Sequence, residues 1–573
     1  MSILGRCLLV SCVPLLVAAG CAPGTTSPFS APGPQSSGPK RIVAAITGDP
    51  HTLYNKLNTN NAVRGIDSVE KLVIAGLAIE DEQDRFRPQL AESVPSLDNG
   101  QWQLFPDGRM ETTWRLRPEA TWHDGTPFTA DDLLFTAQVV RDRELPVFGH
   151  IGLLALDEVE AVDASTVRAK WKQPYIDADR LFAVGTSTFA QPLPKHLLQA
   201  AYLENKDGLT DLPYWTTAFV GTGPFKVKDW VSGSHLVLEA VDGYPLGRPR
   251  IDEIEIRFIL DSNTLVANVL AGEIDLTLGR GISIEQALQV RDQWRGGKVD
   301  SGTLRSALNI WPQLLNPSPA IVSDVRFRRA MFRAIDRQAM VDNLQGGLTQ
   351  VVESWLRPSE PEYRDLERNI VRYPYDPRRA IQEIEALGYT RGADGMFRDS
   401  EGQRLGFEYR TITGDINQKT LLAVSDYWQQ AGVAIDQVVI PSQRQSDLPY
   451  RATFPAFELL RGNTSVENSN NLHSAGARLP ENGFRGGPTG GTNYSRYTNP
   501  RLDTQIDRFF ATIPRAERMQ IAGQIIQHMT DQVLVMGMFY DLSPAFVGNR
   551  LRNVSPMGGD QSLPWNAHEW DVS

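Results

Sequence analysis

The order of apolar and polar residues predicts a strand, a turn and a helix between residues 113 and 142. Trp114 and Leu116 stand two positions apart in a β-favouring run, which is the pattern of a strand with one buried face. The segment 123–127 (HDGTP) is typical of a tight turn, because glycine tolerates a positive φ and proline fixes its own φ. We therefore expect a tight turn between this strand and the helix that follows.

The helix is predicted to begin after Thr129. Thr129 occupies an N-cap position, and Asp132 three residues later completes a capping box. Asp131 and Asp132 also face the positive end of the helix dipole. The apolar stripe of the helix continues through Leu133, Leu134, Ala137 and Val140. Such a cap contributes about 1 kcal/mol, so it sets where the helix begins without deciding the fold.

Similar patterns along the rest of the chain predict an α/β protein. Strands are expected at residues 41–47, 156–162, 166–171, 236–240, 251–259, 405–412, 434–440 and 533–540. Helices are expected at residues 68–79, 265–270, 417–431 and 515–532. The strand–helix–strand order of residues 405–440 predicts one β-α-β unit. Because 573 residues are too many for one core, we expect two or three domains.

The amino terminus has the composition of an export signal. Arg6 provides a positive charge, an apolar run follows, and small residues precede Cys21. Residues 1–20 are therefore predicted to be a signal peptide. A lipoprotein signal would leave Cys21 as an acylated first residue, whereas a plain secretory signal would be cleaved after the small residues. Both remain open, because Ala18 stands where a lipobox usually has leucine.

Residues 21–40 are rich in proline, glycine, serine and threonine, which predicts a flexible tether. No later stretch reaches the roughly 18 apolar residues of a spanning helix. Two or three acyl chains on Cys21 would hold the protein durably on a membrane. We therefore expect an exported protein that is lipid-anchored at the outer face of the cytoplasmic membrane, in the periplasm or at the cell surface.

Charge and cysteine positions exclude several classes of function. The net charge is −11 at pH 7, and it becomes −12 without residues 1–20, whose one charged residue is Arg6. Such an acidic balance argues against nucleic acid as a partner. The three cysteines, Cys7, Cys12 and Cys21, all fall within the first 21 residues. The rest of the chain therefore has no disulfide, no thiol chemistry and no cysteine-ligated metal.

The sequence carries no recognised catalytic motif. It contains neither His-Glu-x-x-His nor Gly-x-Ser-x-Gly, and its eight histidines include no pair at metal-ligand spacing. The glycine-rich segments 221–224 and 486–491 lack the Lys-Ser/Thr of a phosphate-binding loop, so we expect a strand entry and a loop near the ligand cleft. We expect no catalytic residue, metal or cofactor. A glycosidase-type carboxylate pair is not excluded among 68 acidic residues.

The segment around the predicted turn resembles the signature of the family 5 extracellular solute-binding proteins, the peptide and nickel binders that feed ABC importers. The matching residues are Leu116, Arg117, Trp122, His123, Asp124, Gly125, Thr126, Pro127, Phe128, Thr129, Ala130, Asp131 and Asp132. Further matches follow in family order at residues 49–53, 220–230, 242–244, 272–275, 325–337 and 375–389. The resemblance covers about residues 41–545.

This resemblance implies an α/β, two-lobed periplasmic-binding-protein fold of class II type, with an extra domain inserted in the first lobe. Lobe I would comprise residues 41–72, 219–306 and 541–573. The inserted domain II would comprise residues 73–218, and lobe III residues 307–540. Two strand-like crossovers would form the hinge, and the strand predicted at 533–540 would lead the chain back into lobe I.

The resemblance also implies the receptor of an ABC importer. Such a receptor captures a peptide-like solute between its lobes, closes, and docks on a permease/ATPase complex without making or breaking a bond. We expect a monomer. The alternative solutes are an oligosaccharide, an opine or a metal chelate. The alternatives of a different class are a secreted lipoprotein hydrolase and a signalling or adhesion protein that no longer transports.

The resemblance to the peptide-binding members implies ligand contacts in three places: the loop after the first strand, the segment that follows the strand near Phe457, and the junction where the strand at 405–412 enters the next helix. Arg410, Thr411, Thr413, Asp415 and Asn417 would line this junction. Amide donors and the helix dipole favour an anion such as a carboxylate at such a position. The alternative is that Arg410 is a solvated strand residue.

Other expected contacts follow residue 457 and precede residue 500. Peptide binders carry an aspartate there that pairs with the ligand's α-amino group, whereas this chain has Asn463, Thr464 and Glu467 and no aspartate. Glu467 is either its substitute or an ordinary loop acid. The missing aspartate leaves open a neutral or sugar-like ligand, held by amide and hydroxyl donors and by stacked aromatic rings. The further candidates are Trp311, Asn493 and Tyr494.

Overall fold

The computed structural model describes residues 38–573, apart from residues 59–62, 84, 143, 149–154, 185–189, 280, 301, 359, 446, 485, 487–491 and 556–562. The predicted signal peptide, Cys21 and most of the predicted tether lie outside the described residues, as does most of the 486–491 segment. Pro39 to Ser573 form one structural unit. No helix in the described ranges has both the length and the apolar character needed to cross a membrane.

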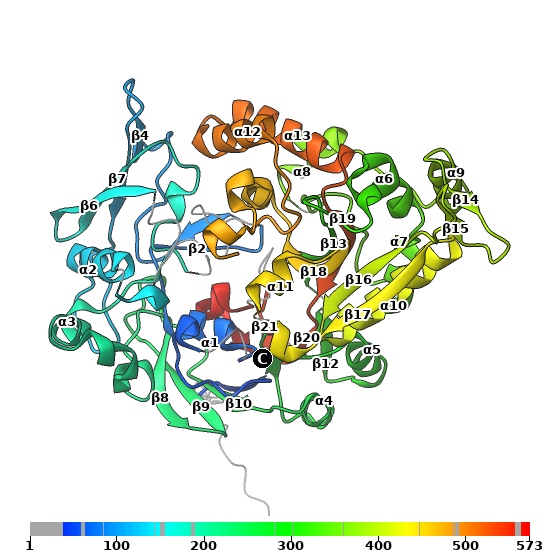
Figure 1. Cartoon of the computed structure of the whole chain (residues 1–573). Helices are drawn as coiled ribbons and strands as arrows, with labels where there is room; N and C mark the ends of the chain where they lie inside the picture. The colour runs from blue at the N-terminus through cyan, green and yellow to red at the C-terminus, as the bar shows by residue number, and fades with distance from the viewer. Residues whose placement is uncertain are drawn as a thin grey trace, which may run out of the picture. The chain divides into compact units, whose positions relative to one another are not determined.

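A seven-stranded sheet has the order β12-β20-β11-β1-β10-β9-β8, and Figure 1 labels its strands β8, β9, β10, β12 and β20. Its strands are β1 (Arg41–Ile46), β8 (Phe225–Val231), β9 (His235–Ala240), β10 (Glu253–Phe258), β11 (Leu276–Thr277), β12 (Gly297–Asp300) and β20 (Ala545–Gly548). On β1, Ala44 and Ile46 belong to the core that includes α1 (Ile66–Val73), whereas Ala45 packs with α4 (Ser262–Leu270) and α5 (Ile284–Gln293). Because both faces are buried, β1 reads as a nearly continuous apolar run.

A four-stranded antiparallel sheet has the order β4-β5-β7-β6. Its strands are β4 (Trp102–Leu104), β5 (Met110–Arg115), β6 (Leu156–Asp163) and β7 (Thr166–Trp171), and the helices α2 (Ala130–Arg141) and α3 (Lys195–Glu204) accompany it. The capping box predicted at the start of α2 is confirmed, since the Thr129 N–H donates to the Asp132 carboxylate at 3.0 Å. The predicted alternation of β5 is also confirmed, because Trp114 is fully buried.

A five-stranded sheet has the order β17-β16-β18-β13-β19. Its strands are β13 (Thr303–Pro312), β16 (Gly406–Ile412), β17 (Ala434–Ile440), β18 (Phe457–Asn463) and β19 (Met536–Leu542). The predicted β-α-β unit is confirmed, because α10 (Asp415–Gln430) joins the parallel strands β16 and β17. Alternate residues of β18 belong to two different cores: Phe457 and Leu459 to one, Leu460 to the other.

The remaining elements complete the described chain. The helices are α6 (Val325–Arg333), α7 (Arg337–Leu344), α8 (Tyr363–Leu366), α9 (Pro377–Glu385), α11 (Leu448–Ala452), α12 (Pro500–Ala511) and α13 (Arg515–Asp531). The short strands are β2 (Ala78–Glu80), β3 (Phe86–Pro88), β14 (Thr390–Arg391), β15 (Phe397–Arg398), β21 (Leu551–Arg552) and β22 (Asp571–Val572).

Two adjacent strand segments connect the seven-stranded sheet to the five-stranded sheet. In the first sheet Asp300 of β12 pairs with Ala545 of β20, and in the second Thr303 of β13 pairs with Leu542 of β19. The antiparallel register is therefore the same on both sides of the crossing. The prediction that the chain returns after residue 540 is confirmed, because β20 follows β19 and joins the other sheet.

The helix predicted at residues 68–79 is wrong in its extent. Helix α1 ends at Val73, and residues 78–80 form β2 instead. The cause is a long-range contact: the Gly223 N–H donates to the Val73 carbonyl at 3.0 Å, and the Thr222 hydroxyl donates to the Ala75 carbonyl at 2.7 Å. A Cβ on Gly221 would overlap the Val73 carbonyl oxygen, so glycine is required at this close approach.

Candidate functional site

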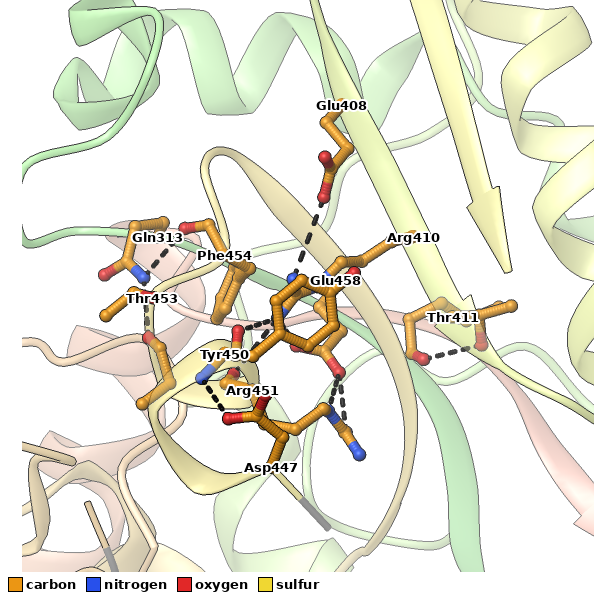
Figure 2. A network of polar contacts seen from close by, with 12 residues as sticks. Gln313, Glu408, Arg410, Thr411, Asp447, Tyr450, Arg451, Thr453, Phe454 and Glu458 are labelled. Atoms are coloured by element: carbon orange, nitrogen blue, oxygen red, sulfur yellow. Dashed lines mark hydrogen bonds and ion pairs between the residues drawn. The ribbon is translucent and has the colours of Figure 1, made fainter. Parts of the chain in front are cut away.

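A buried ion-pair network lies on one face of the five-stranded sheet (Figure 2). Glu458 on β18 is fully buried and stands beside Arg410 of β16 in the strand register. Its carboxylate accepts hydrogen bonds from Arg410 Nη2 at 3.1 Å and from Arg451 Nη2 at 2.6 Å. Arg410 is itself only 1% exposed, so the alternative of a solvated strand residue is wrong.

The segment 450–454 completes this network through its backbone carbonyl groups. Arg410 Nη2 donates to the Tyr450 carbonyl at 2.9 Å, and its guanidinium lies 4.6 Å from the Tyr450 ring centre. Gln313 donates to the carbonyl groups of Ala452 and Phe454 at 3.1 and 3.0 Å. The side chains of Arg410 and Gln313 therefore hold the end of α11 in one place (Figure 2).

The five residues expected at the junction between β16 and α10 lie there, but they differ in burial and in hydrogen-bonding partners. Thr411 is buried and donates its hydroxyl to the Leu459 carbonyl at 2.9 Å. Thr413 is exposed and accepts from the Gln445 side-chain amide at 2.8 Å. Asp415 is exposed and pairs with Lys419 at 2.7 Å, whereas Asn417 is 5% exposed. The structure thus places Arg410 and Thr411 in the sheet and the other three at the start of α10.

The segment after β18 lies against a segment that precedes α3. Glu467 lies 3.7 Å from Arg180 Nη2, and Asp177 and Asp179 also approach Arg180, at 3.1 and 4.0 Å. Burial raises the pKa of the Asp179 carboxyl to about 6, against the opposing effect of Arg180. Thr464 is fully buried, and Asn463 pairs with Ser306 in the register of β13.

The aromatic candidates form a contiguous array. The ring centres of Trp311 and Tyr494 are 5.2 Å apart, and the ring centres of Trp311 and Trp355 are 5.9 Å apart. The Arg478 guanidinium lies 4.8 Å from the Tyr494 ring centre. Trp311 stands opposite Glu458 in the register of β13 and β18, so directly paired side chains place the array on the same sheet face as the ion pairs.

Asn493 has a different environment from its neighbour Tyr494. It is fully buried, and its amide donates to the carbonyl groups of His473 and Tyr497 at 3.2 and 2.8 Å. Its side-chain oxygen accepts from the Tyr497 N–H at 3.1 Å. These bonds hold the segment that presents Tyr494.

Four residues of this site were missed by sequence reasoning: Arg451, Glu458, Arg478 and Trp355. Glu458 had a usable signal, since it is a charge between the apolar residues Phe457 and Leu459 of a buried strand. Arg478 had none, because it lies in an irregular segment where charged residues are ordinary.

Comparison with known proteins decides the family. The model described as "Bacterial extracellular solute-binding proteins, family 5 Middle" matches residues 85–483. The chain belongs to this family. The family 5 proteins bind solutes and are not catalytic, so the alternative of a hydrolase is set aside. In the described part of the chain, no three His, Cys, Asp or Glu side chains gather as a metal site.

Relatives of this family 5 protein resemble it in sequence and in fold. It is 26% identical over 444 residues to the oligopeptide-binding protein AppA of Bacillus subtilis, covering 76% of this chain and 75% of AppA. The structure of AppA in complex with a nonapeptide superposes with a TM-score of 0.69 and 20% identity, covering 93% of this chain and all of AppA. NikA from Brucella suis in complex with Fe(III)-EDTA gives a TM-score of 0.74 and 17% identity, covering 93% of this chain and all of NikA.

These findings confirm the predicted periplasmic-binding-protein fold of mixed α/β class. As a member of this family, the chain is an extracellular solute-binding protein, and several of the relatives it resembles are named ABC transporter peptide-binding proteins. The extracellular character of the family suggests that the chain is exported.

Proposed function

We propose that this protein captures a peptide-like solute between two lobes and closes around it by a hinge movement. The lobes are residues 41–72, 219–306 and 541–573 on one side and residues 307–540 on the other, with residues 73–218 inserted in the first. The closed form delivers the solute to a permease/ATPase complex. The solute contacts are those expected from the sequence, with the aromatic array at their centre.

The observation that carries this proposal is the paired crossing between the two sheets. Asp300 with Ala545 and Thr303 with Leu542 keep one register across it. Two adjacent segments that cross together allow rotation while they restrict sliding, which is the geometry of hinge closure. A solute that contacts both lobes only when they are closed shifts the equilibrium by its differential affinity, and a shift from 1:99 to 99:1 requires about 5.5 kcal/mol.

Two ion pairs join residues that we assign to different lobes or domains. Lys419 on α10 lies 2.7 Å from Glu285 on α5, and Arg180 lies 3.7 Å from Glu467. In the proposed mechanism these pairs form on closure and separate on opening. Because they are partly exposed, each contributes about 0–1 kcal/mol, which is small enough for the opening to be reversible.

A peptide-like solute is supported by the relatives that share most of the chain. AppA and the putative peptide-binding protein of Brucella melitensis are 26% and 24% identical to it. An oligosaccharide, an opine or a metal chelate is the alternative outcome of the test below. We also propose that residues 1–20 are removed on export and that acylated Cys21 anchors the protein at the outer face of the cytoplasmic membrane.

Native mass spectrometry of the protein purified from its own host tests the proposal. We expect a mass excess of a few hundred daltons that disappears on unfolding and that fragments as a peptide. If the fragments are those of a sugar or of a metal chelate, the solute is that compound and not a peptide. An unliganded protein whose melting temperature is unchanged by a random peptide mixture would contradict peptide capture. Substitution Cys21→Ala should move the protein from the membrane fraction to the soluble exported fraction.

A further inference from the structure

The aromatic array contains buried hydrogen-bond donors that have no acceptor. The indole Nε1 atoms of Trp311 and Trp355 are buried without a hydrogen-bonding partner. The same holds for Nε and Nη1 of Arg478. Burying a polar group without a hydrogen-bonding partner destabilises a folded protein, and burying a charged group without one does so more strongly, so such atoms require an explanation.

The position of Arg478 is well defined by its neighbours. Ala477 forms an isolated bridge with Asn493, which sets Arg478 beside Tyr494. The Tyr494 ring offers its π-face to the guanidinium at 4.8 Å, but it offers no acceptor to the two orphaned N–H groups. The aromatic contact therefore orients Arg478 and leaves its hydrogen-bonding edge free.

The charge around this position is unbalanced. Arg478 interacts electrostatically with Arg410, Arg451 and Glu458, and burial lowers its pKa. Both oxygens of Glu458 are already engaged by Arg410 and Arg451. Arg410 also lies 3.8 Å from the carboxylate of Glu408. Three guanidinium groups thus face two carboxylates, and the positive excess remains at Arg478.

We propose that Arg478 anchors a subsite for a carboxylate group of the solute, an assignment that rests on the proposed solute-binding function. The guanidinium fork matches a carboxylate in two parallel hydrogen bonds. Trp311 and Tyr494 pack against the adjoining part of the solute, and the indole N–H groups of Trp311 and Trp355 donate to its acceptors. The solute is thus an acid whose anionic group pairs with the positive excess of this face.

The test compares Arg478→Met with Arg444→Met. Arg444 is a matched control, because its guanidinium also lies over a tyrosine, 3.5 Å from the Tyr450 ring centre, but it is half exposed and pairs with Asp447. Each protein is stripped of bound solute by unfolding and refolding. The probes are a random tripeptide mixture with free carboxyl termini and the same mixture with amidated carboxyl termini, measured by calorimetry.

We expect the wild type and Arg444→Met to bind the free acids at least tenfold more tightly than the amides. Arg478→Met should lose this preference through a 10- to 100-fold weaker affinity for the acids. Without ligand, Arg478→Met should melt at the same temperature as the wild type or about 1–2 °C higher, because two buried N–H groups without an acceptor are removed from a half-buried charged side chain.

Two results would overturn the carboxylate subsite: an acid preference that persists in Arg478→Met, or a ligand-free Arg478→Met protein that melts more than 2 °C below the wild type. Equal binding of acids and amides by the wild type would also overturn it and would leave peptide capture intact. If the wild type binds neither mixture, peptide capture fails. Citrate and EDTA then replace the peptides, and the subsite stands only if they stabilise the wild type and not Arg478→Met.

Discussion

His123 and Gly221 hold each other through two hydrogen bonds. The His123 N–H donates to the Gly221 carbonyl at 2.9 Å, and the Gly221 N–H donates to Nδ1 of the His123 ring at 3.1 Å. The other ring nitrogen, Nε2, lies 3.0 Å from the Gly223 carbonyl. The ring must therefore be neutral, with its proton on Nε2. This pair joins the two segments that carry the strongest family motifs.

The neutral His123 ring should make the protein sensitive to acid. Burial lowers the pKa of His123 to about 4, so the native state binds this proton less tightly than the unfolded chain does. Stability from this group is present above the unfolded pKa of about 6.5 and is lost as the pH falls towards 4, by about 1–3 kcal/mol. His123→Gln should be less stable at pH 7.5 and show a smaller fall in melting temperature between pH 7.5 and 4.5.

His51 is exposed and provides the control for this prediction. His51→Gln should follow the wild-type melting curve at every pH. An equal pH dependence in His123→Gln and the wild type would show that His123 is not responsible.

Gly221→Ala should destabilise the protein. The added Cβ would overlap the Val73 carbonyl oxygen at the end of α1, which is a backbone atom and cannot turn aside as a flexible side chain can. Strain of this kind costs about 1–3 kcal/mol and should lower the melting temperature by several degrees. Gly243→Ala is the control, because nothing lies within 4 Å of its added Cβ. Equal melting temperatures of the two variants would contradict the close approach.

Asp179→Asn should stabilise the ligand-free protein at neutral pH. Burial and the neighbouring Asp177 raise the pKa of Asp179 to about 6, although Arg180 and Arg518 oppose the shift. The native state then binds this proton more tightly than the unfolded chain, so stability from this group is present at low pH and is lost as the pH rises through 6. The free energy of unfolding of Asp179→Asn should exceed that of the wild type by about 1–2 kcal/mol at pH 7.5, and this difference should vanish near pH 4.

Melting curves of wild type and Asp179→Asn at pH 7.5, 6 and 4.5 check this prediction. Asp229→Asn, an exposed position, should change none of them. A gain that is independent of pH would point to a cause other than the ionisation of Asp179.

Glu285→Gln should weaken solute affinity slightly. It removes one of the two carboxylates that pair with Lys419, the other being Asp415; the Glu285 and Lys419 side chains lie 2.7 Å apart and are 60% and 38% exposed. Exposed pairs contribute about 0–1 kcal/mol and are screened by salt, so we expect a loss of about two- to fivefold at low ionic strength and none at 0.5 M salt. Calorimetry with the co-purified solute measures it. Asp292→Asn on the same helix α5 should have no effect, and an equal loss in both variants would exclude a specific role for the pair.

Local patterns explain what could be predicted from the chain. The capping box could be predicted because its two residues, Thr129 and Asp132, are three positions apart. The unit β16-α10-β17 could be predicted because the spacing of apolar residues changes from the alternation of a strand to the period of a helix and back. The end of α1 could not be predicted, because it depends on Gly221 and Thr222, which lie almost 150 residues away along the chain.

The same division applies to the candidate site. Arg410 was recognised as a candidate from its position at the end of a strand, but its partner Glu458 lies 48 residues further on and reaches it only through the register of β16 and β18. Arg478 becomes significant only when the bridge from Ala477 to Asn493 sets it beside Tyr494. The sequence around Arg478 has no feature that distinguishes this residue from the other arginines of the chain.

The amino-acid sequence by itself determined the family, the α/β class and the order of most helices and strands, since these follow from motifs and periodicities of neighbouring residues. The tertiary structure decided which charges are buried, which of them are neutralised, and which donors are left without an acceptor. Those properties belong to pairs of distant segments, because burial and pairing free energies exist only once the sheets have brought the segments together.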